Sequence, residues 1–186
     1  MNFPYSRPYL DDNDASEVVK VLKHQYLTQG TVVTELEAAL VNLFSVKHAI
    51  VCNSGTAALH MAYDGIGLGP NKGLVTSSVT FVATANAARL CGAPVSLADV
   101  DPVSGNVTVE TIKAAVQNAE FETKAIAIVH LGGRPCDIVK ISQYAESIGA
   151  YLIEDAAHAP MAQYSNEHNE FFSVGSCKHS TAATIS

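Results

Sequence analysis

Two acidic residues and a histidine lie close together in the last quarter of the chain. Residues 151–153 are apolar, Glu154 and Asp155 follow directly, and His158 comes three residues later. If residues 151–153 form a buried strand, both carboxylates lie at its C-terminal end, where open α/β sheets bind their ligands. A carboxylate there can pair with a cationic ring nitrogen, bind a ribose hydroxyl, act as a base, or cap the next helix. This segment alone does not decide between these functions.

A second candidate site is residues 53–60, which read Asn-Ser-Gly-Thr-Ala-Ala-Leu-His. The segment follows an apolar run and opens a helix, so the amides of Thr56 and Ala57 would point out of the helix N-terminus. Phosphate is favoured there by the helix dipole and by the unpaired amides. The segment matches neither the dinucleotide-binding nor the P-loop pattern, and Ser-Gly-Thr before a helix can also be only a cap.

Phe81 and Arg134 follow two further apolar runs. Phe81 lies at an expected strand-to-helix turn, where its ring could lie flat against a planar ligand or belong to the core. Arg134 ends the segment His-Leu-Gly-Gly-Arg on the expected ligand side, where it could meet an anion or serve only solubility.

Three expected strands thus end in a phosphate-type turn, an aromatic ring and a pair of acids. Together these features predict a site for a flat, phosphorylated, nitrogen-containing ring, and pyridoxal 5′-phosphate matches this description. Asp155 would keep the pyridine nitrogen protonated, so that the ring can accept electrons. No metal site is predicted.

The elements that must position these residues alternate along the chain. Strands are expected at residues 48–52, 73–76, 94–98, 125–131 and 151–153, and residues 184–186 resemble the start of another. Helices are expected from a capping box at Asp14, and at residues 33–44, 54–63, 81–90, 108–118 and 137–148. This alternation predicts right-handed βαβ units, a mostly parallel sheet and an α/β fold.

Composition limits the classes of partner. The chain has 186 residues, of which 48% are apolar and 16% charged. Its net charge is −7, and the sequence contains no basic cluster that could bind nucleic acid. Cys52, Cys91 and Cys136 lie in or beside apolar segments and form no C-x-x-C pair, so buried free thiols are expected. With no signal-peptide core and no apolar run of about 18 residues, we expect a cytoplasmic protein without a membrane partner.

With these residues in place, the sequence resembles the sugar-nucleotide aminotransferases of the DegT/DnrJ/EryC1/StrS family over residues 5–186. The resemblance rests on six ordered blocks, at residues 26–30, 53–60, 80–86, 99–101, 130–135 and 154–158. Within the family, residues 5–8 and 177–186 look most similar to enzymes that aminate UDP-linked 4-keto-6-deoxy-N-acetylhexosamines on the route to pseudaminic acid.

The resemblance implies a three-layer α/β/α domain of the fold-type-I pyridoxal phosphate class and assigns cofactor contacts to six residues. Thr56, Ala57 and Ser186 would bind the phosphate, Phe81 would stack on the pyridine ring, Asp155 would pair with its nitrogen, and His158 would lie near its phenolic oxygen.

The family's Schiff-base lysine is expected about five residues beyond Ser186, so no catalytic residue is assigned within this chain. Lys178 precedes the motif and is not a substitute. Residues 1–30 are expected to form an N-terminal arm and first helix, and residues 31–186 an incomplete cofactor-binding domain. A C-terminal small domain is expected to be absent, and a neighbouring subunit of a homodimer completes the site in this family.

The function implied is amino transfer, usually from glutamate, to a keto-sugar nucleotide. Two alternatives remain open at this point. Some relatives replace the lysine with histidine and act as sugar dehydratases, and the 186 residues by themselves could be a truncated, catalytically inert product.

Overall fold

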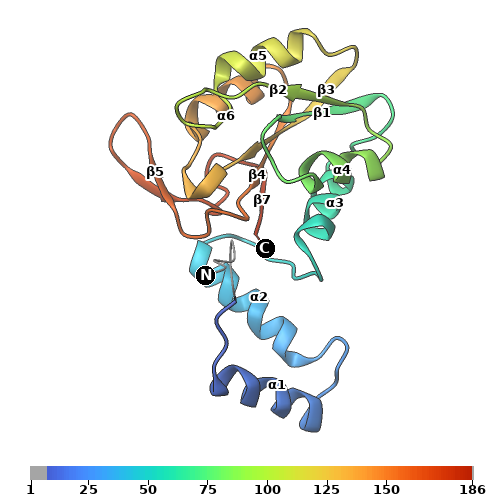
Figure 1. Cartoon of the computed structure of the whole chain (residues 1–186), viewed down its shortest axis with the longest axis vertical. Helices are drawn as coiled ribbons and strands as arrows, with labels where there is room; N and C mark the ends of the chain where they lie inside the picture. Colours follow the sequence, from blue (N-terminus) through green and yellow to red (C-terminus); the bar gives the residue numbers. More distant parts are fainter. Residues whose placement is uncertain (1–7, 186) are drawn as a thin grey trace, which may run out of the picture.

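A parallel five-stranded sheet forms the centre of the computed structural model, which describes residues 8–185 (Figure 1). The strand order is β2-β1-β3-β4-β7, and all four neighbouring pairs are parallel. The strands are β1 (Lys72–Ser77), β2 (Val95–Ala98), β3 (Glu122–Val129), β4 (Tyr151–Asp155) and β7 (Ala182–Thr184). The predicted α/β fold with a mostly parallel sheet is confirmed.

Helices cover both faces of the sheet. On one face lie α3 (Gly55–Gly65) and α4 (Ala83–Leu90), and on the other α5 (Val109–Gln117) and α6 (Ile138–Ser147). Alternate residues of β3 enter two separate cores, because successive side chains of a strand point to opposite faces. Ile126 and Ile128 pack in the core beneath α5 and α6, whereas Ala125 and Ala127 pack in the core beneath α3 and α4. The chain therefore forms three layers, as expected.

The same alternation separates the two acids at the end of β4. Leu152 belongs to the core beneath α5 and α6, and Ile153 belongs to the core beneath α3 and α4. Glu154 consequently faces the α5–α6 side and Asp155 the α3–α4 side. Only one of the two neighbouring carboxylates can serve a site on a given face.

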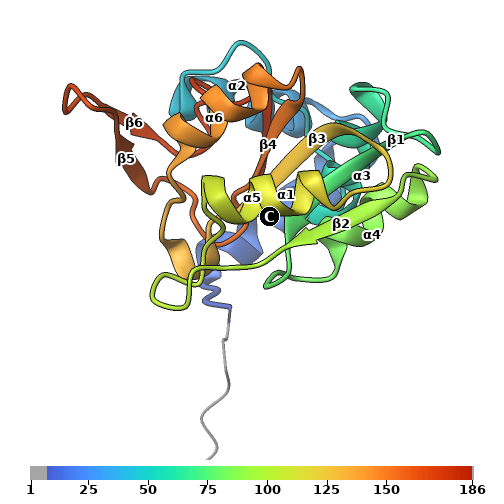
Figure 2. The ribbon, with the colours of Figure 1, turned by 90° about the horizontal axis from the view of Figure 1, so that it is seen from above.

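Five further elements complete the described chain. The N-terminal helices α1 (Asp12–His24) and α2 (Thr31–Phe44) extend away from the sheet, and α1 has no buried residue within residues 8–185. A two-stranded antiparallel hairpin, β5 (Gln163–Ser165) and β6 (Phe171–Ser173), projects from one side (Figure 2). A short 3-10 turn, η1 (Leu131–Gly133), follows β3.

Two local predictions are wrong. The capping box of α1 begins at Asp11 rather than Asp14, because the Asp11 side chain accepts the amides of Asn13 and Asp14 while the Asp14 side chain accepts the Asp11 amide. Residues 48–52 form no strand. They have no strand partner within the described chain, Ile50 is 74% exposed, and the amide of Val51 donates instead to Glu37 Oε1 at 3.0 Å.

The last predicted strand is displaced. β7 covers Ala182–Thr184, so it ends where the sequence pattern suggested a beginning. Its register pairs Asp155 with Thr184, which places both residues at the same edge of the sheet.

Candidate active site

A cavity of about 480 Å³ lies at the carboxyl ends of the parallel strands. The residues at or just after the ends of β1, β3, β4 and β7 reach it, together with the first turn of α3. It is lined by Ser54, Gly55, Thr56, Leu59, Thr80, Phe81, Ala83, Val129, Asp155, Ala157, His158, Thr184 and Ile185. Four of the six predicted site residues are therefore brought together around one cavity. Ala57 follows Thr56 in the same helix, and Ser186 lies outside the described residues.

The N-terminus of α3 presents backbone amides to this cavity. The Ser54 side chain accepts the amide of Ala57 at 3.2 Å, which makes Ser54 the helix cap. The first amides of a helix have no partner within it, so those of Gly55 and Thr56, which both line the cavity, remain for a ligand. The Thr56 hydroxyl adds a donor. A phosphate contact from Ala57 stays a prediction, and it requires Ser54 to release that amide.

Phe81 forms part of the cavity wall, and the residue is 71% exposed. This exposure excludes the alternative of a core phenylalanine. An aromatic ring on a cavity wall offers its face to a planar ligand. Its backbone is fixed by the amide of Thr84, which donates to the Phe81 carbonyl at 3.2 Å.

Asp155 is 7% exposed and directs its carboxylate to the same cavity. Oδ2 accepts the Thr84 hydroxyl at 2.7 Å, and Oδ1 accepts the Ala157 amide at 3.3 Å. Within the described chain no helix follows β4, so Asp155 is not a helix cap. A carboxylate oxygen can accept more than one hydrogen bond, which leaves capacity for a ligand donor.

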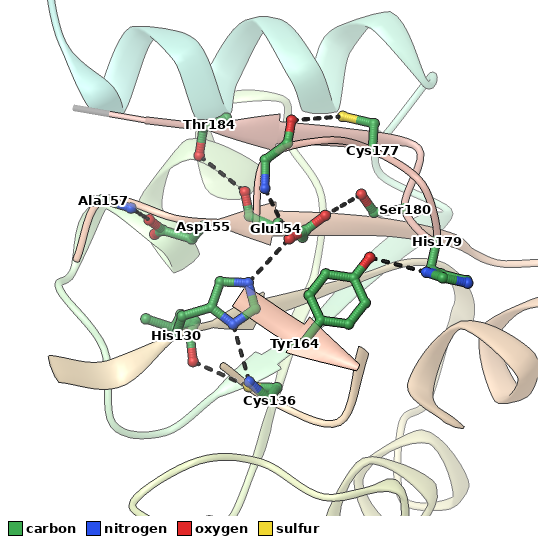
Figure 3. A network of polar contacts seen from close by, with 12 residues as sticks. His130, Cys136, Glu154, Asp155, Ala157, Tyr164, Cys177, His179, Ser180 and Thr184 are labelled. Carbon is green, nitrogen blue, oxygen red and sulfur yellow. Dashed lines mark hydrogen bonds and ion pairs between the residues drawn. The ribbon is translucent and has the colours of Figure 1, made fainter. Parts of the chain in front are cut away.

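Glu154 lies on the opposite face in a buried polar network (Figure 3). Its Oε2 lies 3.2 Å from His130 Nε2 and accepts the Gly175 amide at 3.4 Å, while Oε1 accepts the Ser180 hydroxyl. His130 Nδ1 accepts the Cys136 amide at 3.1 Å, so the ring proton is on Nε2 and points to Glu154.

Two groups near Glu154 have raised pKa values. Burial, with a further contribution from the Glu154 carboxylate, raises the pKa of Cys136 to about 12. The same two causes raise the pKa of Tyr164 to about 12. This network was not predicted from the sequence. A signal for it exists, since His130 and Glu154 both lie at the ends of expected strands.

His158 is exposed at the cavity edge, where its Nδ1 accepts the Gly132 amide at 3.4 Å. Gly132 and Gly133 have φ values of 60° and 85°, and a Cβ on Gly133 would lie 3.2 Å from the His158 carbonyl oxygen. The two glycines thus allow the turn after β3 to approach His158 closely.

Arg134 does not reach this site. Arg134 lines a separate cavity of about 610 Å³, which lies between residues 104–110, the start of α6 and the β5–β6 turn. Arg134 follows the end of β3 as expected, but it does not line the cavity that the other predicted site residues share.

Three further observations bear on chemistry. Among residues 8–185, no lysine lines the 480 Å³ cavity, and Lys178 is exposed in the loop that precedes β7. The described part of the chain contains no cluster of three or more acidic, histidine or cysteine side chains that could hold a metal ion. None of its helices is both long and apolar enough to cross a membrane.

The thiols are all free, as predicted, but only Cys136 is buried; Cys52 and Cys91 are partly exposed.

The sequence is similar to those of one family of aminotransferases. The model of the DegT/DnrJ/EryC1/StrS aminotransferase family matches residues 8–186. A UDP-4-amino-4,6-dideoxy-N-acetyl-beta-L-altrosamine transaminase from Campylobacter jejuni is 38% identical over 160 residues, which are 86% of this chain and 42% of that protein. A GDP-perosamine synthase from Caulobacter vibrioides is 36% identical over 171 residues, 91% of this chain and 45% of that protein.

The fold is also similar to that of a solved aminotransferase. The Helicobacter pylori aminotransferase PseC, involved in the biosynthesis of pseudoaminic acid, superposes with a TM-score of 0.85 at 28% identity, covering 100% of this chain and 48% of that one. The chain therefore spans less than half the length of these relatives.

Proposed function

Because this chain belongs to the DegT/DnrJ/EryC1/StrS aminotransferase family, we propose that it forms the cofactor-binding part of a pyridoxal-phosphate-dependent nucleotide-sugar aminotransferase. One observation carries the proposal. A buried carboxylate, an exposed aromatic ring and a helix N-terminus with free amides surround a single cavity at the carboxyl edge of a parallel sheet.

The donor set fits pyridoxal phosphate. Asp155 would accept a hydrogen bond from the protonated pyridine nitrogen, Phe81 would stack on the ring, and the amides of Gly55 and Thr56 with the Thr56 hydroxyl would bind the phosphate. His158 would lie near the phenolic oxygen, and Ser186, which lies outside the described residues, would add a phosphate contact. When bound, the cofactor supplies an electron-accepting ring that stabilises a carbanion. The role of Asp155 is to hold the ring nitrogen in its protonated form.

The substrates follow from the relatives. Two of them are named as a UDP-sugar transaminase and a GDP-perosamine synthase, which supports a keto-sugar nucleotide as the amino acceptor. We assign glutamate as donor, a 4-keto-6-deoxyhexosamine as acceptor, a homodimer as the working assembly and the cytoplasm as location. The relatives' names favour amino transfer over dehydration of the sugar.

We assign the Schiff-base lysine to a position outside the described residues, since none of the described cavity residues is a lysine. The residues around the 480 Å³ cavity then bind and orient the cofactor.

The test is a binding titration. Pyridoxal phosphate is added to the wild-type chain and to Asp155→Asn, and the dissociation constant is read from quenching of tyrosine fluorescence. Asp155→Asn should bind about 10-fold more weakly, because it loses one charge-assisted hydrogen bond. Glu122→Gln, which changes an exposed acid at the start of β3, is the matched control. Equal affinity of all three proteins would contradict the proposed site.

A further inference from the structure

The Thr84 side chain stands directly behind Asp155. Thr84 is fully buried in the first turn of α4, on a helix face otherwise made of alanines. Its hydroxyl oxygen lies 2.7 Å from Asp155 Oδ2, 2.7 Å from Thr80 Oγ1 and 3.2 Å from the Phe81 carbonyl oxygen. The one polar side chain on this buried face thus meets the carboxylate that faces the cavity.

The number of hydroxyl protons fixes which group donates and which accepts in this cluster. Thr84 has a single hydroxyl proton for three oxygen neighbours. A carboxylate is the stronger acceptor, and it is also nearer than the Phe81 carbonyl. The Thr84 hydroxyl therefore donates its hydrogen bond to Asp155 Oδ2, and the Thr80 hydroxyl donates a hydrogen bond to the Thr84 oxygen. The result is a chain of two hydroxyls that ends on Asp155.

The backbone of Thr84 is fixed at both ends. Its amide donates to the Phe81 carbonyl at 3.2 Å, and its carbonyl accepts the Tyr63 hydroxyl at 3.1 Å. Burial, with the nearby Asp155 carboxylate, raises the pKa of Tyr63, which keeps this phenol protonated as a donor. Thr84 is thereby connected to α3, to the Phe81 turn and to the end of β4.

We propose that Thr84 is a positioning residue, which fixes the Asp155 carboxylate relative to the ring of Phe81. Both groups contact the ring of the cofactor in the proposed function, on which this inference rests. A hydroxyl is required for this role, because a side chain of the same shape without it would fill the space but leave Oδ2 without its donor. Only the 3.3 Å contact between Oδ1 and the Ala157 amide would then hold the carboxylate. Thr84 itself does not line the cavity, so it acts through its two neighbours.

Three variants separate positioning from packing. Thr84→Val keeps the shape and removes the hydroxyl, and Thr84→Ser restores the hydroxyl. The matched control is Thr76→Val, since Thr76 is equally buried and its hydroxyl donates to the Ala127 carbonyl at 3.0 Å, away from Asp155. Thermal unfolding of each variant reports the cost that any lost buried hydrogen bond would have.

The first readout needs no cofactor. The carboxyl carbon of Asp155 is followed by NMR in the unliganded chain, and it should shift in Thr84→Val, return in Thr84→Ser and stay unchanged in Thr76→Val. An unshifted signal in Thr84→Val would overturn the proposal whatever the cofactor does.

The second readout uses pyridoxal phosphate labelled with ¹⁵N in the pyridine ring. Thr84→Val should move the ring-nitrogen signal and weaken binding about 10-fold, the usual effect of one hydrogen bond to a charged group. In an Asp155→Asn background the same substitution should change the ring-nitrogen signal no further. An independent effect there would show that Thr84 acts by packing. If the wild-type chain binds no cofactor while the carboxyl shift is present, the proposed function fails and the Thr84–Asp155 contact stands without its role.

Discussion

His130 Nε2 lies 3.2 Å from Glu154 Oε2, with both side chains closed off from solvent. The contact joins the ends of neighbouring strands β3 and β4, and Glu154 extends it to Gly175 and Ser180 in the loop that leads to β7. Every side-chain oxygen of Glu154 is thus used to hold the framework. The two adjacent acids therefore have different roles. Glu154 stabilises the edge of the sheet, and Asp155 faces the cavity.

Replacing Glu154 with glutamine should destabilise the fold. The amide has one acceptor in place of two, and its NH₂ group would meet a donor of the network. We expect the free energy of unfolding in urea to fall by about 2–4 kcal/mol. Glu122→Gln, on the surface, should change it by less than about 0.5 kcal/mol. A small effect in Glu154→Gln would show that the network contributes little.

Removing the Phe81 ring should weaken cofactor binding without unfolding the protein. Phe81 is 71% exposed, so the core loses little, whereas stacking contributes about 0.5–1.5 kcal/mol. Phe81→Ala should therefore raise the dissociation constant of pyridoxal phosphate about 3- to 10-fold. Phe171→Ala, with a ring 70% exposed on the hairpin, is the control and should bind normally.

The Thr56 hydroxyl should act only on the phosphate. Thr56 is exposed at the start of α3, so Thr56→Val should leave the unfolding free energy nearly unchanged. We expect it to weaken pyridoxal phosphate about 10-fold, as for a lost charge-assisted hydrogen bond. Pyridoxal without phosphate should bind both proteins equally. A parallel loss of pyridoxal affinity would place Thr56 at the ring instead.

Stability should fall at high pH through Cys136. Its pKa is raised from 9.0 to about 12 in the folded protein, so above pH 9 the unfolded chain releases a proton that the folded chain keeps. Unfolding is then favoured by up to about 1.4 kcal/mol per pH unit between pH 9 and 12. Tyr164, raised from 10.0 to about 12, adds to this loss above pH 10.

Urea titrations at pH 8, 9 and 10 measure this slope. Cys136→Ala should be less stable at pH 8 but should lose less on going to pH 10. Cys52→Ala, at a partly exposed thiol, should keep the wild-type slope. Identical slopes for all three proteins would mean that another group controls the pH dependence.

Lys178 should not form a covalent bond to the cofactor, because it is exposed in the loop before β7 and does not line the cavity. Borohydride reduction of the chain mixed with equimolar pyridoxal phosphate, followed by peptide mass mapping, should leave Lys178 unmodified. A specific adduct at Lys178 that is absent from Lys178→Arg would assign it the Schiff-base role.

Most elements could be predicted because their signals are local. The helices expected from residues 54 and 137, which Ser54 and Asp137 cap, and the apolar runs of β1, β3 and β4 lie where the sequence indicates them. Residues 48–52 show the limit of this approach. An apolar run becomes a strand only when a neighbouring backbone accepts its hydrogen bonds, and that depends on chain far away in sequence.

The sequence by itself determined the chemistry available at the carboxyl edge of the sheet: an acid at Asp155, a ring at Phe81 and a helix start at Thr56. Only the tertiary structure decided how these groups are used. The packing of α3 and α4 fixed the face that carries the cavity, which selected Asp155 over Glu154, excluded Arg134 and placed Thr84 behind the carboxylate. The physical reason is that side-chain chemistry belongs to a residue, whereas direction and burial belong to its neighbours in space.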